Sequence, residues 1–304
     1  MTGERIKILS LTLKKLFLIL AAYYLRHNQI EKGRYRLLTL LRPIGRKIGH
    51  TLGWRRIKTR HGFLMDLNLQ DWIPQDIYIM GDFEPATSTV AKKLLRKGDV
   101  VVDVGANIGY FSLLFSRCVG TDGHVYSFEP VPQLASSIRK NADLNQYKQI
   151  TLSNLALSDH SGQARFYVGP EDNSGLSSLR QPRGSSGTLD VTLARFDDIF
   201  SDSENIALVK IDVEGAELAV LRGMNEYLRS KHPYILIEVT NRFLKEMGDS
   251  EQNLLAYMQD LGYCCYVIGD TRIELLQLRK HPLPDQWNAL FSVEKVFGEG
   301  SELN

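Results

Sequence analysis

Cysteine is scarce in this chain of 304 residues, which contains only Cys118, Cys264 and Cys265. An adjacent pair cannot easily close a normal disulfide, and the three positions do not show the spacing of metal ligands. The sequence therefore argues against a disulfide framework or a cysteine-bound zinc. We expect three buried thiols in a reducing compartment, which indicates a cytoplasmic protein.

A long hydrophobic run is also lacking. Residues 8–25 are strongly apolar, but Lys14 and Lys15 interrupt them and leave only Leu16–Leu25 uninterrupted. That run is about half of the ~20 residues that a bilayer-spanning helix needs. A basic start and a short apolar run would also suit a signal peptide, although no small-x-small cleavage site follows. The alternatives are a helix lying in a membrane interface and a helical arm packed on the body or on a partner subunit.

Acidic residues are rare at the start of the chain. Residues 1–60 hold fifteen Lys and Arg against two Glu, a net charge of +13, whereas the remainder carries −11. This asymmetry suggests that the N-terminal segment meets something anionic while the remaining body need not. We expect peripheral membrane contact through residues 1–50, at the inner face of a membrane, or a packed arm. Nucleic acid is a weaker alternative, and the oligomeric state stays open.

From Val100 onward, apolar runs of strand length alternate with helical patterns, which predicts parallel βαβ units. The expected architecture is α/β, a doubly wound and mostly parallel sheet of seven strands whose last strand is antiparallel. The predicted strands are 100–105, 124–128, 150–157, 206–213, 234–239, 263–268 and 288–293, with helices at 108–117, 132–144, 217–230 and 252–261.

The chain divides into four segments by pattern. Residues 1–53 form the basic helical extension, and residues 54–98 combine a β-hairpin around His61-Gly62 with a helix that Pro85 begins. Residues 99–296 form the main domain, and residues 297–304 are expected to fray. Residues 161–195 interrupt the alternation with a hairpin-like insertion. Its Gly/Ser-rich loop would either close over a ligand or lie passively at the surface.

The turn after the first strand lacks the middle glycine of a dinucleotide-binding fold. It reads VVVDVGANIG, with Gly105 and Gly109 around Asn107, rather than G-x-G-x-x-G. Asp103 stands where its carboxylate would repel phosphate and suit a cationic amino acid. Glu129, twenty positions after Gly109, ends the second strand, where a carboxylate usually binds ribose hydroxyls. S-adenosylmethionine suits this pattern better than NAD, although the turn of any α/β protein would look similar.

Two carboxylates mark the predicted reaction site, because Asp212 ends the fourth strand and Glu238 lies near the end of the fifth. Lys210 and Glu214 would share a face with Asp212 if the strand stays extended. Asp212 or Glu214 would accept a proton from an attacking hydroxyl, and Lys210 would hold a carboxylate in place. A structural ion pair is the alternative. Two carboxylates without histidine are weak evidence for a divalent metal, and none is predicted.

Taken together, several motifs resemble the FkbM family of S-adenosylmethionine-dependent methyltransferases. The resemblance rests on KGDVVVDVGANIGYFSLLFS, VYSFEPVP, NLALSD, NSGLSSL and LVKIDVEGAELAVLRG, and covers residues 78–268. It implies a Rossmann-like methyltransferase sheet and O-methylation of a hydroxyl on a natural product, a glycan or a lipid-linked sugar. The family acts on many substrates, so the resemblance does not give the acceptor.

The resemblance also implies ligand contacts for particular residues. Glu84 would approach the amino acid end of S-adenosylmethionine, Glu129 and the adjacent Pro130 the ribose, and Asn154 to Ala156 the adenine. The turn residues would line the methionine moiety; they are Asp103, Gly105, Asn107 and Gly109. The alternative functions are an NAD-dependent oxidoreductase and a non-catalytic protein that binds membrane or nucleic acid.

Overall fold

The computed structural model describes residues 2–28, 34–200, 204–279, 281–298 and 300–303. The chain forms two compact units, of which the first comprises Met1–Phe83 with Glu171–Gly175 and the second Glu84–Pro170 with Leu176–Asn304. Their boundary at Phe83/Glu84 falls inside the segment 54–98 that the sequence pattern groups together. Residues 1 and 29–33 of the predicted basic extension lie outside the described residues.

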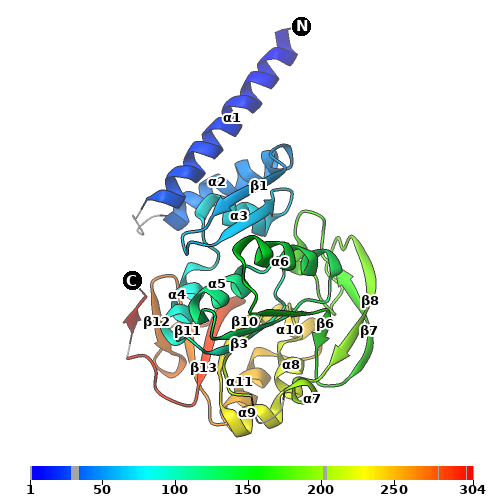
Figure 1. Cartoon of the computed structure of the whole chain (residues 1–304), viewed down its shortest axis with the longest axis vertical. Helices are drawn as coiled ribbons and strands as arrows, with labels where there is room; N and C mark the ends of the chain where they lie inside the picture. The colour runs from blue at the N-terminus through cyan, green and yellow to red at the C-terminus, as the bar shows by residue number, and fades with distance from the viewer. Residues whose placement is uncertain (1, 29–33, 201–203, 280, 299, 304) are drawn as a thin grey trace. The chain divides into compact units, whose positions relative to one another are not determined.

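The first unit consists of helices and one hairpin (Figure 1). Leu18, Ala22 and Leu25 of its long N-terminal helix are buried, while most other residues between Ser10 and His27 are exposed. The predicted hairpin is confirmed, with Trp54 opposite Asn68 and Lys58 opposite Leu64. The elements are α1 (Thr2–His27), α2 (Arg34–Ile48), η1 (Gly49–Thr51), β1 (Trp54–Lys58), β2 (Leu64–Asn68) and α3 (Trp72–Met80).

Helix α3 is a feature that the sequence analysis missed. Asp71 caps its start by accepting a hydrogen bond from the Ile73 N–H, and Gly81 ends it at a φ of 69°. Asp71 also accepts a hydrogen bond from the hydroxyl of Ser174, which belongs to the same compact unit. The cap residue therefore fixes both the helix and the short segment 171–175.

The second unit is built on a nine-stranded sheet of order β14-β12-β11-β13-β10-β9-β3-β4-β5. The seven predicted strands are all present, and β13 runs antiparallel to both of its neighbours, as expected. The prediction of seven strands is nevertheless too low, because β12 and β14 extend the edge beyond β11. The strands are β3 (Val100–Val104), β4 (His124–Phe128), β5 (Ile150–Ser153), β9 (Ile206–Ile211), β10 (Tyr234–Thr240), β11 (Cys264–Ile268), β12 (Arg272–Leu275), β13 (Gln286–Ser292) and β14 (Ser301–Glu302).

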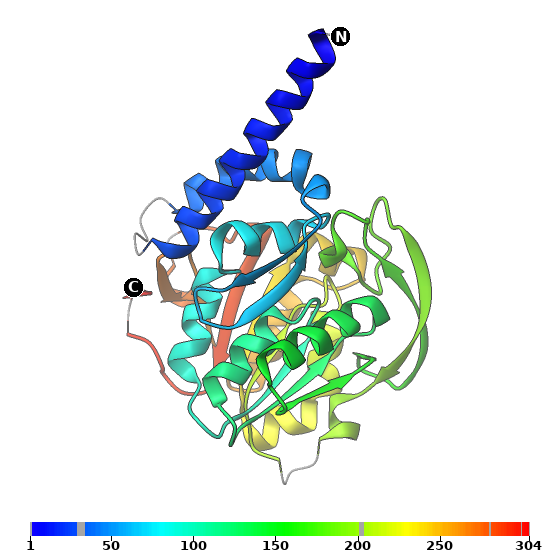
Figure 2. The same cartoon turned by 45° about the horizontal axis from the view of Figure 1, so that its top comes forward.

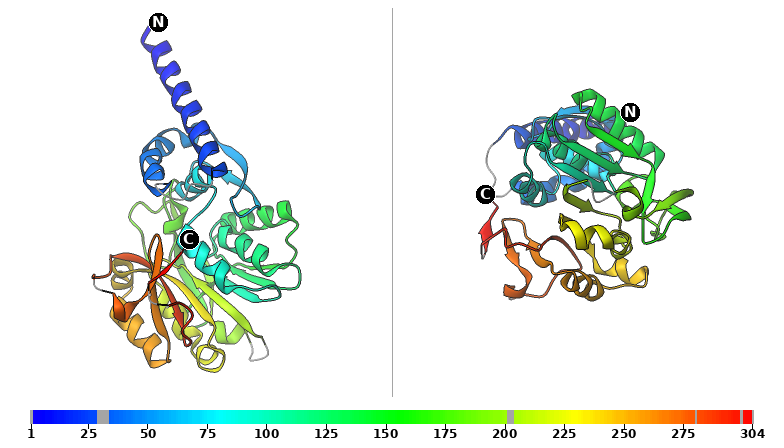
Figure 3. Two further views of the ribbon diagram at one scale, coloured as in Figure 1. Left: turned by 90° about the vertical axis from the view of Figure 1, so that its left-hand side faces the viewer. Right: turned by 60° about the horizontal axis from the view of Figure 1, so that its bottom comes forward.

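Helices cover both faces of this sheet (Figure 3). One apolar cluster, which includes Val102, Val209 and Leu221, fills the layer between the central strands and the helices that follow them. Burial of these side chains is the main stabilising contribution to the unit. The helices are α4 (Pro85–Leu94), α5 (Tyr110–Val119), α6 (Pro132–Asn145), α7 (Phe196–Ile199), α8 (Glu217–Gly223), α9 (Asn225–Lys231), α10 (Asn241–Glu246), α11 (Glu251–Asp260) and η3 (Leu276–Leu278).

The predicted insertion is confirmed as a second, three-stranded sheet of order β6-β8-β7 (Figure 2). Strands β7 (Gly162–Val168) and β8 (Gly187–Ala194) form a long antiparallel pair, and β6 (Leu155–Leu157) lies parallel to β8. A loop that contains η2 (Ser174–Leu176) joins β7 to β8. The prediction of one strand over 150–157 is wrong, because the chain leaves the large sheet at Asn154 and enters the small one.

Two further expectations need correction. The helix predicted at 217–230 is two helices, α8 and α9, because the chain turns at Met224. Glycine at 223 permits the close approach of Ser158, whose carbonyl oxygen would lie 1.9 Å from a Cβ atom there. The tail does not simply fray, since Ser301 and Glu302 pair with β12.

The cysteines are free thiols, as predicted, but each is half-buried rather than buried. Burial raises the pKa of the Cys118 thiol, against the effect of nearby Lys92, Lys97 and Arg117. Among the described residues, no helix combines the length and the apolar character that crossing a bilayer requires.

Candidate active site

The turn after β3 depends on a close backbone approach at Gly105. Its φ is 79°, and a Cβ atom there would lie 1.9 Å from the carbonyl oxygen of Asp212. Asn107 has a φ of 51°, and Gly109 has a φ of 88° against the side chain of Ile138. Glycine is needed at 105 because no side chain fits between this turn and the end of β9.

Glu129 joins the end of β4 to that turn. One carboxylate oxygen accepts a hydrogen bond of 2.8 Å from the Asn107 N–H, and the other accepts one of 2.8 Å from the Val131 N–H. Burial raises the pKa of Glu129 to about 8, against the effect of these two amide donors. The exposed Asn154 side chain donates to the Glu129 carbonyl at 3.2 Å, so Glu129 and Asn154 lie together. Pro130 is buried beside them.

Asp103 is fully buried beneath the turn. Its carboxylate accepts a hydrogen bond of 2.6 Å from the hydroxyl of Ser112, which in turn accepts one of 2.9 Å from Ser127. Burial raises the pKa of Asp103, while Lys210 and Ser112 act in the opposite direction. Direct contact between Asp103 and a ligand stays a prediction, because its side chain has no exposed surface here.

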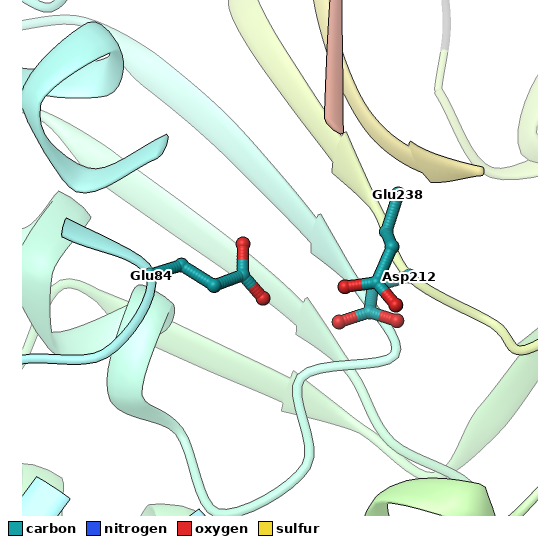
Figure 4. A group of neighbouring side chains, drawn as sticks. All are labelled: Glu84, Asp212 and Glu238. Carbon is teal, nitrogen blue, oxygen red and sulfur yellow. The ribbon is translucent and has the colours of Figure 1, made fainter. Parts of the chain in front are cut away.

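Three carboxylates converge at the carboxyl edge of the sheet (Figure 4). Oxygen atoms of Glu84, Asp212 and Glu238 all lie within 4.8 Å of one another. They come from the start of α4, the residue after β9 and the end of β10, which the parallel strand order brings to one edge. Glu84 accepts a hydrogen bond of 3.2 Å from Asn288, and Glu238 accepts one of 2.5 Å from Gln286.

Lys210 supplies a positive charge within this cluster. Its Nζ atom donates to Asp212 at 3.0 Å and lies 4.5 Å from the centre of the Phe111 ring. The Lys210 side chain is 5% exposed, against 23% for Asp212. Burial alone would lower the pKa of Lys210, but the attraction of Asp212, Glu84 and Asp103 outweighs it and raises the pKa. Lys210 is therefore a stable cation at neutral pH.

A single lysine does not neutralise the cluster. Burial raises the pKa of Glu84, with Asp212 adding to the effect and Lys210 opposing it. Burial, followed by repulsion from Asp212 and from Glu84, also raises the pKa of Glu238 well above its usual value. Carboxylates at this spacing attract either a hard divalent cation or an organic cation such as an ammonium group.

The expectation that Glu214 shares an extended strand face with Lys210 and Asp212 is wrong. Strand β9 ends at Ile211, and Glu214 adopts a left-handed backbone with a φ of 56°. Burial raises the pKa of Glu214 well above its usual value, and Asp212 and Glu217 add to the effect. The backbone turn thus re-aims the Glu214 side chain.

The sequence analysis missed Glu217, which closes the same turn. This buried side chain accepts a hydrogen bond of 2.8 Å from the Gly215 N–H, and burial raises its pKa to about 7. It also missed the contacts that the β7–β8 loop makes with this turn, although the resemblance to the FkbM family had rested in part on the NSGLSSL motif of that loop. Ala156 is buried in the small sheet, so an adenine contact there stays a prediction.

Comparisons with known proteins point to one family. A sequence model described as the methyltransferase FkbM domain matches residues 103–265. The hexuronic acid methyltransferase AglP of Haloferax volcanii is 31% identical over 146 residues, which cover 47% of this chain and 57% of AglP. The 31-O-demethyl-FK506 methyltransferase FkbM of Streptomyces tacrolimicus is 31% identical over 162 residues, which cover 43% of this chain and 62% of that protein.

Among solved structures, the methyltransferase FkbM of Methylobacillus flagellatus is 16% identical, with a TM-score of 0.40. The match covers 72% of this chain and 52% of that one. The chain thus spans little more than half the length of the relatives it matches.

Two reasons for glycine at position 105 can be tested separately: its positive φ and its close approach to the Asp212 backbone. We expect Gly105→Ala to lower the free energy of unfolding by several kcal/mol, because the new methyl group displaces the Asp212 backbone. Gly98→Ala is the matched control, because Gly98 has a φ of 87° but no atom within 4 Å of the new Cβ. It should lose only about 1 kcal/mol. Urea unfolding measures both, and equal losses would contradict the close approach.

Proposed function

The chain belongs to the FkbM methyltransferase domain family, and from this membership we propose that it transfers the methyl group of S-adenosylmethionine to an oxygen of its acceptor. The observation that carries the proposal is the arrangement at one sheet edge. Neighbouring strands there end in the glycine turn, in Glu129, which is predicted to bind ribose, and in the carboxylates Asp212 and Glu238. An open α/β sheet binds its ligands at this edge.

The residues present suit S-adenosylmethionine. Each Glu129 oxygen keeps a second lone pair beyond its amide donor, which a ribose hydroxyl can use. The cluster of Glu84, Asp212 and Glu238 carries more negative charge than Lys210 balances, so it would attract the ligand's ammonium and sulfonium groups rather than require a metal. When bound, the cofactor supplies an activated methyl group on a good leaving group.

The chain's own residues then need to position the acceptor and remove its proton. Asp212 is partly exposed and fixed by Lys210, so it would orient an acceptor hydroxyl along the line of attack. Burial raises the pKa of Glu214 well above its usual value, which makes it a stronger proton acceptor than an exposed carboxylate, and it lies in the same turn. We assign the proton transfer to Asp212 or Glu214, with Glu238 and Lys210 tuning the charge around them.

For the acceptor class, we propose a hydroxyl of a glycan, a lipid-linked sugar or a natural product. The names of the two relatives support this breadth, since one acts on a hexuronic acid and the other on a demethylated FK506. The test measures the S-adenosylhomocysteine that forms when the protein and S-adenosylmethionine are incubated with each of a panel of acceptors. The panel contains glucuronic acid, galacturonic acid and their neutral hexose counterparts.

Cofactor binding comes before the acceptor screen. We expect calorimetric titration with S-adenosylhomocysteine to show micromolar affinity in the wild type. Glu129→Ala should weaken binding by about 30-fold or more, because it removes both oxygens that accept hydrogen bonds from the ribose hydroxyls. Glu226→Ala is the control, since that side chain is 79% exposed. Absence of binding by folded wild type would overturn the proposed function.

Binding should also release protons. Burial and the repulsion among these carboxylates raise the pKa values of Glu84 and Glu238, so the unliganded cluster holds protons to a higher pH than exposed carboxyls do. An ammonium group placed among them lowers those pKa values, so up to about one proton leaves on binding. Titration with S-adenosylhomocysteine in phosphate and in Tris at pH 7.5 measures this release through the buffers' different ionisation enthalpies.

The release should fall in Glu238→Gln and stay unchanged in Glu226→Gln. It should also disappear at a pH high enough to ionise both carboxyls before the ligand binds. Equal binding enthalpies in the two buffers would place the ammonium group outside the carboxylate cluster.

We further propose that α1 rests on an anionic membrane surface. Five large apolar side chains at helical spacing are each more than half exposed along one face, opposite the buried Leu18 and Ala22. Basic side chains follow from Arg26 onward, which suits anionic lipid headgroups. The exposed side chains are Leu13, Leu16, Phe17, Leu20 and Tyr24.

The proposed contact between these exposed side chains and a membrane can be tested by vesicle co-sedimentation. We expect the double substitution Phe17→Glu with Leu20→Glu to reduce binding to phosphatidylglycerol vesicles by about tenfold or more. The reason is that two apolar side chains can then no longer be buried between the lipid headgroups and the acyl chains. The control pair is Ile199→Glu with Val293→Glu, which adds the same charge at exposed apolar positions of the other unit. Unchanged binding of the α1 variant, or wild-type self-association without lipid binding, would contradict membrane contact.

A further inference from the structure

Ser178, in the loop between β7 and β8, reaches the turn that carries the reaction-site carboxylates. Its hydroxyl is fully buried and lies 2.9 Å from the carbonyl oxygen of Glu214 and 3.3 Å from that of Val213. The same oxygen accepts a hydrogen bond of 3.1 Å from the Arg180 N–H. One hydroxyl therefore ties two segments that are more than thirty residues apart in sequence.

Arg180 strengthens the same junction. Its Nε atom lies 3.4 Å from the Glu214 carbonyl oxygen, and Nη1 donates to Glu246 at 2.9 Å. The guanidinium lies 3.7 Å from the centre of the Phe243 ring. The Arg180 side chain is only 7% exposed. Burial of a guanidinium is costly unless the group is paired and hydrogen-bonded, and these three contacts provide that compensation.

The turn that these two residues hold has an unfavourable backbone conformation. Glu214 has a φ of 56°, a left-handed region that is unfavourable for a residue with a side chain. Gly215 follows with a φ of 112°, and a Cβ atom there would lie 2.8 Å from the Phe243 carbonyl oxygen. On the other side, the Asp212 N–H donates to the Val104 carbonyl at 3.0 Å. Such a conformation persists only when its surroundings fix it.

We propose that Ser178 and Arg180 are positioning residues, which hold the backbone of Val213 and Glu214 so that the Asp212 and Glu214 carboxylates face the acceptor. The role of the two carboxylates rests on the proposed methyl transfer. The insertion is then neither a passive surface loop nor a lid, because it is a permanent part of the reaction site. Neither residue is proposed to touch the cofactor or the acceptor.

Hydrogen–deuterium exchange of the full chain tests the backbone part without any ligand. Ser178→Ala should speed exchange of the amides in residues 213–217 by about tenfold, because the carbonyl groups of Val213 and Glu214 lose the hydrogen bond from the Ser178 hydroxyl. Ser178→Thr keeps a hydroxyl and should restore slow exchange. Unchanged exchange in Ser178→Ala, or no rescue by Ser178→Thr, would overturn the proposal.

Ser186→Ala is the matched control. Its hydroxyl donates to the Gly169 carbonyl at 2.7 Å within the same loop rather than to the reaction-site turn. It should leave exchange at 213–217 unchanged. If Ser186→Ala speeds exchange there as much as Ser178→Ala does, general loosening of the loop explains the effect and the proposal fails.

The catalytic part is tested by turnover with glucuronic acid as the probe acceptor. Ser178→Ala should lower kcat at least about tenfold while the affinity for S-adenosylhomocysteine stays within threefold, because the Asp212 N–H keeps its bond to Val104. Unchanged kcat despite faster exchange would overturn the positioning role. Absence of turnover in the wild type counts against the proposed acceptor, and exchange then decides the present inference alone.

Discussion

The buried ammonium group of Lys210 is the interaction on which the reaction end of the sheet depends. Its register partner across β3 and β9 is Asp103, and it donates directly to Asp212. Without this charge, several carboxylates with little access to water would face one another at short range. Their repulsion would drive them to bind protons or separate, since a buried unpaired charge is far more costly than a paired one. Lys210 thus makes a negatively charged site compatible with a folded sheet.

The site residues that come directly after strands could be predicted from the sequence. Apolar runs placed Glu129 and Asp212 after parallel strands, and parallel strands bring their carboxyl ends to one edge. The helix that Pro85 begins, which leads into the first strand, placed Glu84 near the same edge, with an exposed helix-entry acid as the alternative, and the resemblance to a known family supported the ligand role. The fold class and the strand order around β3 follow from the same alternation of strands and helices.

The remainder depends on contacts that a local pattern does not contain. The left-handed Glu214 receives a hydrogen bond from Ser178, 36 residues away, and the neighbouring Gly215 lies close to the Phe243 carbonyl of α10. The break between β5 and β6 likewise reflects a hydrogen bond from Asn154 to the Glu129 carbonyl. In the first unit, the helical spacing of apolar residues was clear, but only packing shows which side of α1 is buried. Tertiary contacts decide such details over local propensity.

Backbone conformation gives an independent indication of where function lies. Five residues other than glycine have a positive φ among the described residues. Gln146 and His232 each end a helix, where a left-handed residue is ordinary. The other three are Glu84, Asn107 and Glu214, and all lie at the proposed reaction site. A strained residue persists only where its surroundings fix it. The fold is therefore locally less stable at the positions that orient the carboxylates and the cofactor turn.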